Sequence, residues 1–334
     1  GKQYNRFVHE QIAGDELADV DNYSIIATGV YRLGVWDDEP DDKRLAEFDG
    51  LDDIVKTTSE TFIGLTVGCA RCHDHMFDPI SQQDYYQMLS FFRNVRYYDK
   101  PKYEWDSATY SPLISPREVF NWKNKKNKPK NAKPPWDGHE FAMTVREHGP
   151  IAKDTHLLIR GNAGRPSKKV EPEFLKILAS SKPKIPKSSN PFTTGRRLAL
   201  AKWITNSQHP LTSRVMINRI WQFHFGRGLV ATPNDFGKAG MLCSNEALLN
   251  WLAAEFINNG WSIKHMHRVI MSSEVYRRTS WQNPDNQNTD PDNKLFWRQN
   301  LRRLEAEAIR DAILKTSGSL DTKMGGRGFF PAVS

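Results

Sequence analysis

The segment VGCARCHDHMFDP, residues 67–79, places two cysteines three positions apart and a histidine directly after the second. One helical turn separates Cys69 from Cys72, so both thiols can reach the two vinyl groups at one edge of a porphyrin. The next residue, His73, can then point its imidazole at the iron. This C-x-x-C-H spacing is the attachment signature of c-type haem. We therefore expect thioethers at Cys69 and Cys72, and His73 as the proximal axial ligand.

Zinc is the main alternative cofactor, bound by Cys69, Cys72, His73 and His75. Neighbouring ligands at 72 and 73 would crowd one tetrahedron, and no second C-x-x-C or H-x-x-x-H completes a usual zinc pattern. The two cysteines could also form a redox disulfide, although no βαβ pattern accompanies them, or be inert core thiols. The third cysteine, Cys243, is far away in sequence, so the cysteines do not predict a disulfide framework.

Three polar neighbours of the motif are expected to assist the site without binding the iron. They could bond the propionates, orient the ring of His73 through a hydrogen bond, or cap local turns. These residues are Asp74, His75 and Asp78.

A distal ligand to the iron must come from another part of the chain. His75 and Met76 follow His73 too closely to reach the other face of the ring. His224 is the candidate for this role, since it shares a predicted helical face with Ile217 and other apolar residues. The alternatives are that His224 is an ordinary core histidine and that the sixth position of the iron is open.

Helices are expected to position most of these residues. Residues 51–72 predict one helix that leads into the motif, and Ser81 with Asp84 forms an acidic variant of a capping box at the next helix. Residues 97–190 are rich in Pro, Lys and Ser, with short alternating runs that predict strands. We therefore expect a mainly α fold. Two helical domains, 1–100 and 191–334, would be joined by a loop-rich segment with a small β element, 101–190.

Charge and composition limit the partners. The chain has 334 residues with 47 Lys and Arg against 39 Asp and Glu, a net charge of +8, and no long apolar stretch predicts a membrane-spanning helix. Six lysines lie between residues 123 and 133, which predicts either a solvated loop or a docking surface for an acidic redox partner. We expect no nucleic-acid partner, because no recognition motif or aromatic platform accompanies these lysines.

Two further segments carry possible functions. The acidic segment VWDDEPDD, residues 35–42, could supply paired carboxylates for acid/base chemistry on carbohydrate, although such loops are usually solvated or bind calcium. The segment NRIWQFHFGRG, residues 218–228, is where we expect an interface between the two helical domains.

The residues that surround the cysteine motif resemble a known family. FIGLTVGCARCHDHMFDPISQQDYYQMLSFF, residues 62–92, looks like the core of the planctomycete cytochrome-C-like family, and residues 196–237 are similar to the planctomycete-specific C-terminal domain. The resemblance implies a secreted or periplasmic two-domain protein and carries the haem-attachment role to Cys69, Cys72 and His73. It supplies no substrate. Polysaccharide is a possible partner only because the family is abundant in bacteria that degrade complex polysaccharides. Met76 departs from the family pattern, in which a basic residue is common.

Taken together, these features predict a c-type haem protein that transfers electrons in the periplasm or outside the cell. It could be the electron-accepting part of a larger oxidoreductase. The alternatives are a carbohydrate-active enzyme and a zinc-stabilised, non-catalytic surface or assembly module. The sequence leaves open whether the protein is itself an enzyme.

Overall fold

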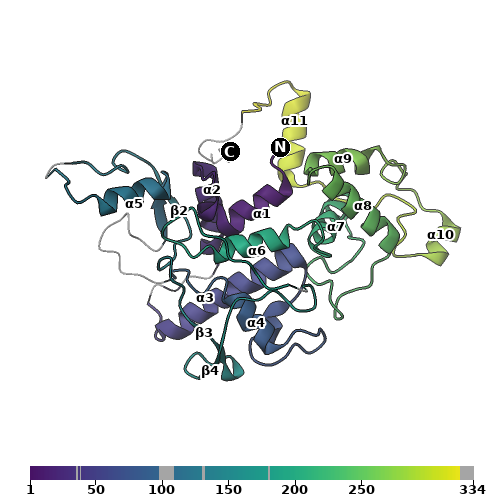
Figure 1. Ribbon diagram of the computed structural model, residues 1–334. Helices are drawn as coiled ribbons and strands as arrows, with labels where there is room; N and C mark the ends of the chain where they lie inside the picture. Colours follow the sequence, from purple (N-terminus) through teal and green to yellow (C-terminus); the bar gives the residue numbers. More distant parts are fainter. Residues whose placement is uncertain (35–36, 38, 98–108, 130–131, 180, 324–334) are drawn as a thin grey trace. The chain divides into compact units, whose positions relative to one another are not determined.

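The computed structural model describes residues 1–34, 37, 39–97, 109–129, 132–179 and 181–323. Within these ranges the chain forms eleven α-helices and two small two-stranded sheets (Figure 1). The predicted mainly α fold is therefore confirmed. None of the helices in this part of the chain is long and apolar enough to cross a membrane.

The chain divides into two compact units, Gly1–Arg277 and Arg278–Ser334. Helices from both regions that were expected to be helical, before residue 100 and after residue 191, share the first unit. Its helices are α1 (Tyr4–Ala13), α2 (Asn22–Ala27), α3 (Lys43–Thr58), α4 (Gln82–Leu89), α5 (Pro116–Asn124), α6 (Arg196–Ile204), α7 (Thr212–Phe225), α8 (Glu246–Asn258) and α9 (Ile263–Ser272). The second unit contains α10 (Pro284–Thr289) and α11 (Ala306–Thr316).

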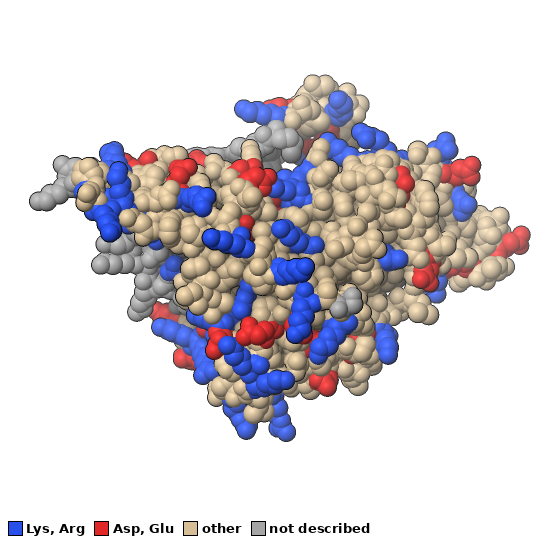
Figure 2. Space-filling model, in the orientation of Figure 1, with Lys and Arg blue, Asp and Glu red and all other residues tan. Residues whose placement is uncertain are grey.

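The strands lie in the segment where the sequence predicted a small β element. β1 (Tyr110–Pro112) pairs antiparallel with β2 (Phe141–Met143), and β3 (Thr155–Leu158) pairs antiparallel with β4 (Pro166–Val170). The β3–β4 hairpin packs against α4. It carries four exposed basic residues, and Figure 2 shows Lys and Arg side chains gathered at this end of the molecule. They are Arg160, Arg165, Lys168 and Lys169.

The first unit is held together by helices that are distant in sequence. α1 packs against α6, α3 against α4, and α7 against α8. Their apolar faces meet in a core of fully buried side chains, as amphipathic helices require. These include Val8, Leu51, Val55, Leu200 and Ile217.

The single helix expected over residues 51–72 is wrong, because the chain changes course before the motif. α3 ends at Thr58 and continues as one π-helical turn, η3 (Ser59–Ile63), which stops at Gly64. Gly64 has φ of +67°, and a Cβ there would lie 2.7 Å from Cγ2 of Val215 on α7. The close approach of α7 therefore requires glycine at this position. A short 3-10 turn, η4 (Val67–Ala70), follows.

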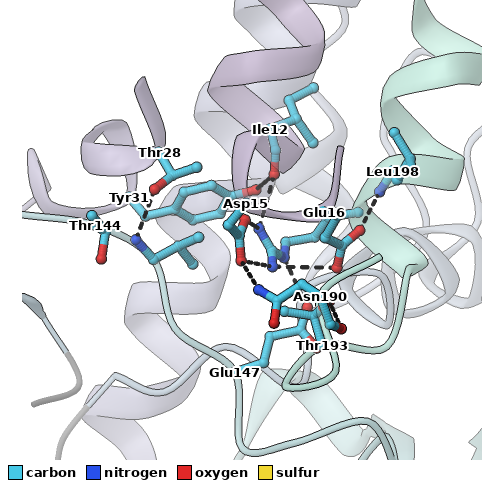
Figure 3. Close-up of polar contacts among 12 residues, drawn as sticks. Ile12, Asp15, Glu16, Thr28, Tyr31, Thr144, Glu147, Asn190, Thr193 and Leu198 are labelled. Atoms are coloured by element: carbon cyan, nitrogen blue, oxygen red, sulfur yellow. Dashed lines mark hydrogen bonds and ion pairs between the residues drawn. The ribbon is translucent and has the colours of Figure 1, made fainter. Parts of the chain in front are cut away.

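A buried ionic network joins three distant parts of the first unit (Figure 3). Arg197 on α6 is fully buried, and its Nη1 and Nη2 donate to the two carboxylate oxygens of Asp15 at 2.7 and 3.0 Å. Its Nε donates to Oε1 of Glu147 at 2.8 Å, and Nη2 lies 3.2 Å from Oε1 of Glu16. We call these four residues the Arg197 network. One guanidinium thus connects the first, middle and last thirds of the unit.

Three acidic side chains surround this single positive charge, and their remaining oxygens accept other N–H groups. Oε2 of Glu16 accepts from the backbone N–H of Leu198 at 2.8 Å, and Oε2 of Glu147 accepts from that of Thr194 at 2.9 Å. Burial, opposed by Arg197 and reinforced by the neighbouring carboxylates, raises the pKa of Glu16 to about 8. The four side chains of the network are therefore buried from solvent, and their polar groups are hydrogen-bonded or ion-paired within the protein.

Candidate cofactor-attachment site

The two motif thiols and the adjacent imidazole lie on the surface of the first unit. Cys69 is in η4, and Cys72 and His73 follow it in an irregular turn. All three residues are exposed, and neither cysteine forms a disulfide. The structure thus brings the three predicted attachment residues together on one accessible turn.

Arg71, between the two cysteines, ties this turn to two helices. Its Nη2 donates to Oδ1 of Asp49 at 2.5 Å, and its Nη1 donates to Oδ2 of Asp52 at 3.2 Å, both on α3. Its carbonyl oxygen accepts from Nε2 of Gln82 at 2.8 Å and from the hydroxyl of Tyr86 at 3.1 Å, both on α4. Burial alone would lower the pKa of Arg71, but the two aspartates raise it. The backbone between the thiols is therefore fixed from behind.

Asp52 also holds the turn through its other neighbours. The hydroxyl of Tyr85 donates to Oδ1 of Asp52 at 2.7 Å, and Nζ of Lys56 lies 2.7 Å from Oδ2. The stem of Lys56 packs on Gly68, where a Cβ would lie 2.3 Å from Cγ of the lysine. The roles of Arg71, Asp52 and Gln82 were not predicted from the sequence. The position of Arg71 between the two cysteines, after a helix that contains Asp52, was the signal in the sequence that could have indicated an ion pair.

The ring of His73 is held in one tautomer. Its Nδ1 lies 2.6 Å from the carbonyl oxygen of Asp74, so Nδ1–H donates to that oxygen. Nε2 then carries the lone pair, and no side chain in the described ranges hydrogen-bonds to it. A metal-binding histidine typically shows this arrangement, in which one nitrogen donates to a carbonyl and the other binds the metal.

His75 has a structural role in the same loop. Its Nδ1 accepts from the backbone N–H groups of Phe77 at 3.2 Å and Asp78 at 2.9 Å. Because Nδ1 accepts, Nε2 carries the proton and donates to Oγ1 of Thr66 at 3.0 Å. Both nitrogens of this buried ring are engaged. A zinc site that used His75 beside His73 would have to break these bonds.

Asp74 and Asp78 each accept a backbone N–H group from another segment. Oδ1 of Asp74 accepts from the backbone N–H of Gln82 at 2.7 Å, at the start of α4, where the helix dipole favours negative charge. Oδ1 of Asp78 accepts from the backbone N–H of Lys238 at 2.7 Å, which ties the loop to a distant part of the chain. Capping, one of the roles expected for these residues, is seen for Asp74. A role toward propionates stays a prediction.

His224 is engaged elsewhere in the unit. Its Nε2 lies 2.8 Å from Nδ1 of His267 on α9, and its ring stands edge-on to Tyr276 at 5.4 Å. Val215, which is nine residues or about 13 Å of helix from His224, is the α7 residue that contacts Gly64, just before the motif. The distal ligand stays a prediction.

The described residues gather no group of three or more His, Cys, Asp or Glu side chains that could hold a metal ion.

In the acidic segment 35–42, Asp42 caps α3 by accepting from the N–H groups of Arg44 and Leu45. Asp38 lies outside the described residues, and the polysaccharide role stays a prediction.

In the Lys-rich segment, Lys125, Lys126 and Lys128 are exposed. Lys128 also lies 5.5 Å from the ring centre of Trp122. Lys130 lies outside the described residues.

The segment 218–228 does connect the two ends of the sequence. Arg219 on α7 donates to the backbone carbonyls of Glu60 and Thr61 in η3. Asn218 in the same segment instead exchanges two hydrogen bonds with the backbone of Val230. Arg219 therefore contacts the turn before the motif.

Comparison with protein families divides the chain into two matched parts. Residues 1–97 match the PSCyt2 family and residues 196–334 match the PSD1 family, each described as a protein of unknown function (DUF1549 and DUF1553). These are the planctomycete cytochrome-C-like and C-terminal domain families, which confirms the resemblance at that level. No curated protein and no solved structure matches the chain. Residues 98–195 lie between the two matches.

Proposed function

We propose that the chain is a c-type haem protein that carries electrons, with haem attached through Cys69 and Cys72 and with His73 as axial ligand. One observation carries the proposal. The hydrogen bond from Nδ1–H of His73 to the carbonyl of Asp74 leaves the Nε2 lone pair free, in the residue that directly follows the second of two exposed thiols in the chain. Bound haem would supply reversible one-electron chemistry at its iron.

The donor set of the turn fits this group. Both thiols are accessible for thioether formation, and the imidazole follows at the spacing that the chemistry requires. Two large apolar side chains also stand out from the loop, Met76 at 80% and Phe77 at 53% exposure. Such side chains are suited to cover a flat apolar group, since their exposure otherwise has no stabilising effect.

The chain's own residues would mainly position the group. The bonds of Arg71 to α3 and α4 fix the backbone between the thiols before any cofactor arrives, which reduces the ordering required on attachment. His75 keeps its loop closed and leaves His73 as the imidazole available to the iron. The acceptor or donor of electrons would be a separate redox protein, and an acidic surface on it would suit the basic charge of this chain.

This role would place the protein in the periplasm or outside the cell, because haem is attached on the outer side of the bacterial inner membrane.

The test of haem attachment is to express the chain in a bacterium that carries the c-type maturation machinery. We expect the intact mass to increase by one haem, with a Soret band and a pyridine-haemochrome spectrum. The double variant Cys69→Ala/Cys72→Ala should lose all three signals. The variant Cys243→Ala is the matched control and should keep them.

His73 can be tested separately from the thiols. In His73→Gly, haem that remains attached should show an altered ferric spectrum, and added imidazole should restore the original one. Unmodified mass and freely reacting thiols in a correctly matured sample would contradict the proposal. Zinc bound in stoichiometric amount, with both thiols protected, would support the zinc module instead.

A further inference from the structure

The β3–β4 hairpin lies against the turn that carries the thiols. Nε2 of Gln82 on α4 donates both to the carbonyl of Arg71, between the cysteines, and to the carbonyl of Leu158, at the end of β3. These two bonds measure 2.8 and 3.0 Å. One side-chain amide therefore fixes the hairpin and the thiol turn to the same point of α4.

The tip of this hairpin approaches Cys72 directly. Gly161 is buried and has φ of +69°, and a Cβ added there would lie 2.8 Å from Sγ of Cys72 and 3.4 Å from Cγ of Arg71. A carbon atom at 2.8 Å from sulfur is well inside van der Waals contact. Any residue other than glycine would therefore displace the thiol as well as strain the backbone.

The two thiols consequently have different surroundings. Cys69 follows Gly68, whose Cα faces the stem of Lys56 on α3. Cys72 instead faces the hairpin, at Gly161. The hairpin belongs to residues 155–170, which lie between the two family matches. Neither matched family segment alone contains all the residues that shape the environment of Cys72.

We infer that Gly161 is a positioning residue for the thiol of Cys72, and that the β3–β4 hairpin forms one wall of the attachment site. The hairpin holds Sγ in the rotamer that the native turn shows, and it limits the side from which a group can bind to that sulfur. This inference concerns the same site as the proposed haem function. Its direct test does not require haem, so the two can fail separately.

The test measures the reactivity of one thiol in the full chain, produced without haem and fully reduced. In a Cys69→Ser/Cys243→Ser background, Cys72 is the remaining cysteine. Its rate of reaction with the neutral disulfide 2,2′-dithiodipyridine is then compared with and without Gly161→Ala. We expect the alanine to push Sγ outward and to raise the rate about threefold, because thiol reactivity follows exposure.

The matched control is Gly138→Ala. Gly138 also has a left-handed backbone, with φ of +79°, but no atom lies within 4 Å of its added Cβ. It therefore produces similar backbone strain without the contact to Cys72. A second variant, Gly161→Asn, keeps the added Cβ while asparagine tolerates the left-handed backbone better than alanine does. It should change the thiol rate as alanine does, with less loss of stability.

Equal thiol rates in Gly161→Ala, Gly138→Ala and the parent would overturn the inference. A changed rate in both Gly161 variants, with an unchanged rate in Gly138→Ala, supports it. Urea unfolding of each variant shows whether the rate follows the local contact or a general loss of structure. If the parent chain never attaches haem, the proposed function fails while this comparison still gives its answer.

Discussion

Two arginines in the first unit each form ion pairs with several acidic side chains, one in a buried and one in a partly exposed environment. Arg197 is fully buried, and three carboxylates and a backbone carbonyl take up its hydrogen bonds. Arg71 is partly exposed, and it binds two aspartates on one side while the thiols beside it stay open to solvent. The first arrangement joins segments of the chain, and the second holds a reactive turn in place.

The difference follows from the free energy of desolvation. A charge that loses its water must be fully paired, so the Arg197 network has no capacity left to bind anything else. At the thiol turn, the paired groups lie behind the backbone and the unpaired groups lie in front, where water solvates them. The bonds of Arg71 thus hold one side of the turn in place, while the thiols on the other side stay accessible.

The largest expected effect comes from removing the buried guanidinium. Arg197→Met should lower the free energy of unfolding by about 3–5 kcal/mol, because Asp15 and Glu147 lose the cation that balances them and Glu16 loses the guanidinium beside its carboxyl group. Urea unfolding measures this loss, and Arg268→Met on an exposed face of α9 is the control, with a change within about 0.5 kcal/mol. Equal effects in the two variants would show that the network adds nothing to stability.

The next effect concerns pH and Glu16. Its pKa is raised to about 8 in the folded chain from 4.5, so the folded state holds a proton that the unfolded state releases. Its contribution to stability is therefore full below pH 4.5 and is lost as the pH rises toward 8. Glu16→Gln should remove this dependence, which amounts to roughly 3–4 kcal/mol between pH 5 and pH 8. Urea titrations at several pH values measure the difference between variant and parent.

For the Glu16 prediction, the control is Glu246→Gln at the exposed start of α8. This variant removes an exposed carboxyl group in place of a buried one. A difference between Glu16→Gln and the parent that stays constant with pH would show that Glu16 does not take up a proton on folding.

A smaller effect is expected at His75. His75→Ala leaves the N–H groups of Phe77 and Asp78 without their acceptor, which should cost about 1–2 kcal/mol of unfolding free energy. His75→Asn places a carbonyl oxygen near the position of Nδ1 and should recover part of this loss. If His75 were instead a cofactor ligand, both variants would alter the spectrum of the loaded protein, whereas we expect the asparagine variant to leave it unchanged.

The smallest effect on stability, about 1 kcal/mol, is expected for Arg71→Met, because partly exposed ion pairs contribute little. The same variant should nevertheless reduce the fraction of chains with covalent haem, measured by intact mass. Arg93→Met is a close control, since Arg93 also binds α3, through Glu47 at 2.8 Å, with a similar side-chain exposure of 14% against 19%. Equal haem loading in both variants would contradict the positioning role of Arg71.

Local signals in the sequence predicted the elements well where local chemistry decides them. The capping box of Ser81 and Asp84 begins α4, as expected. Gly226 ends α7 in a left-handed conformation, which glycine favours. The cap of α8 is Asn245 although Ser244 precedes it, because neighbouring polar residues compete for the same N–H groups.

Contacts between distant residues could not be predicted in this way. The helix expected to reach Cys72 ends early because Val215 on α7 packs against Gly64, a contact that no local pattern reveals. The spacing of Cys69, Cys72 and His73 identified the candidate site, but not the groups that hold it. Gly161 and Gln82 act on the turn from other elements, and only the folded chain places them there.

The Arg197 network also bears on how such genes can change. Its carboxylates at positions 15 and 16 lie in the first family match, and its arginine lies in the second. Cutting a gene between residues 147 and 196 would leave Arg197 in one product and all three of its acidic partners in the other. We therefore expect that neither matched segment, 1–97 or 196–334, folds stably on its own. Recombination should move the two halves as a pair, or restore them as fragments that complement each other.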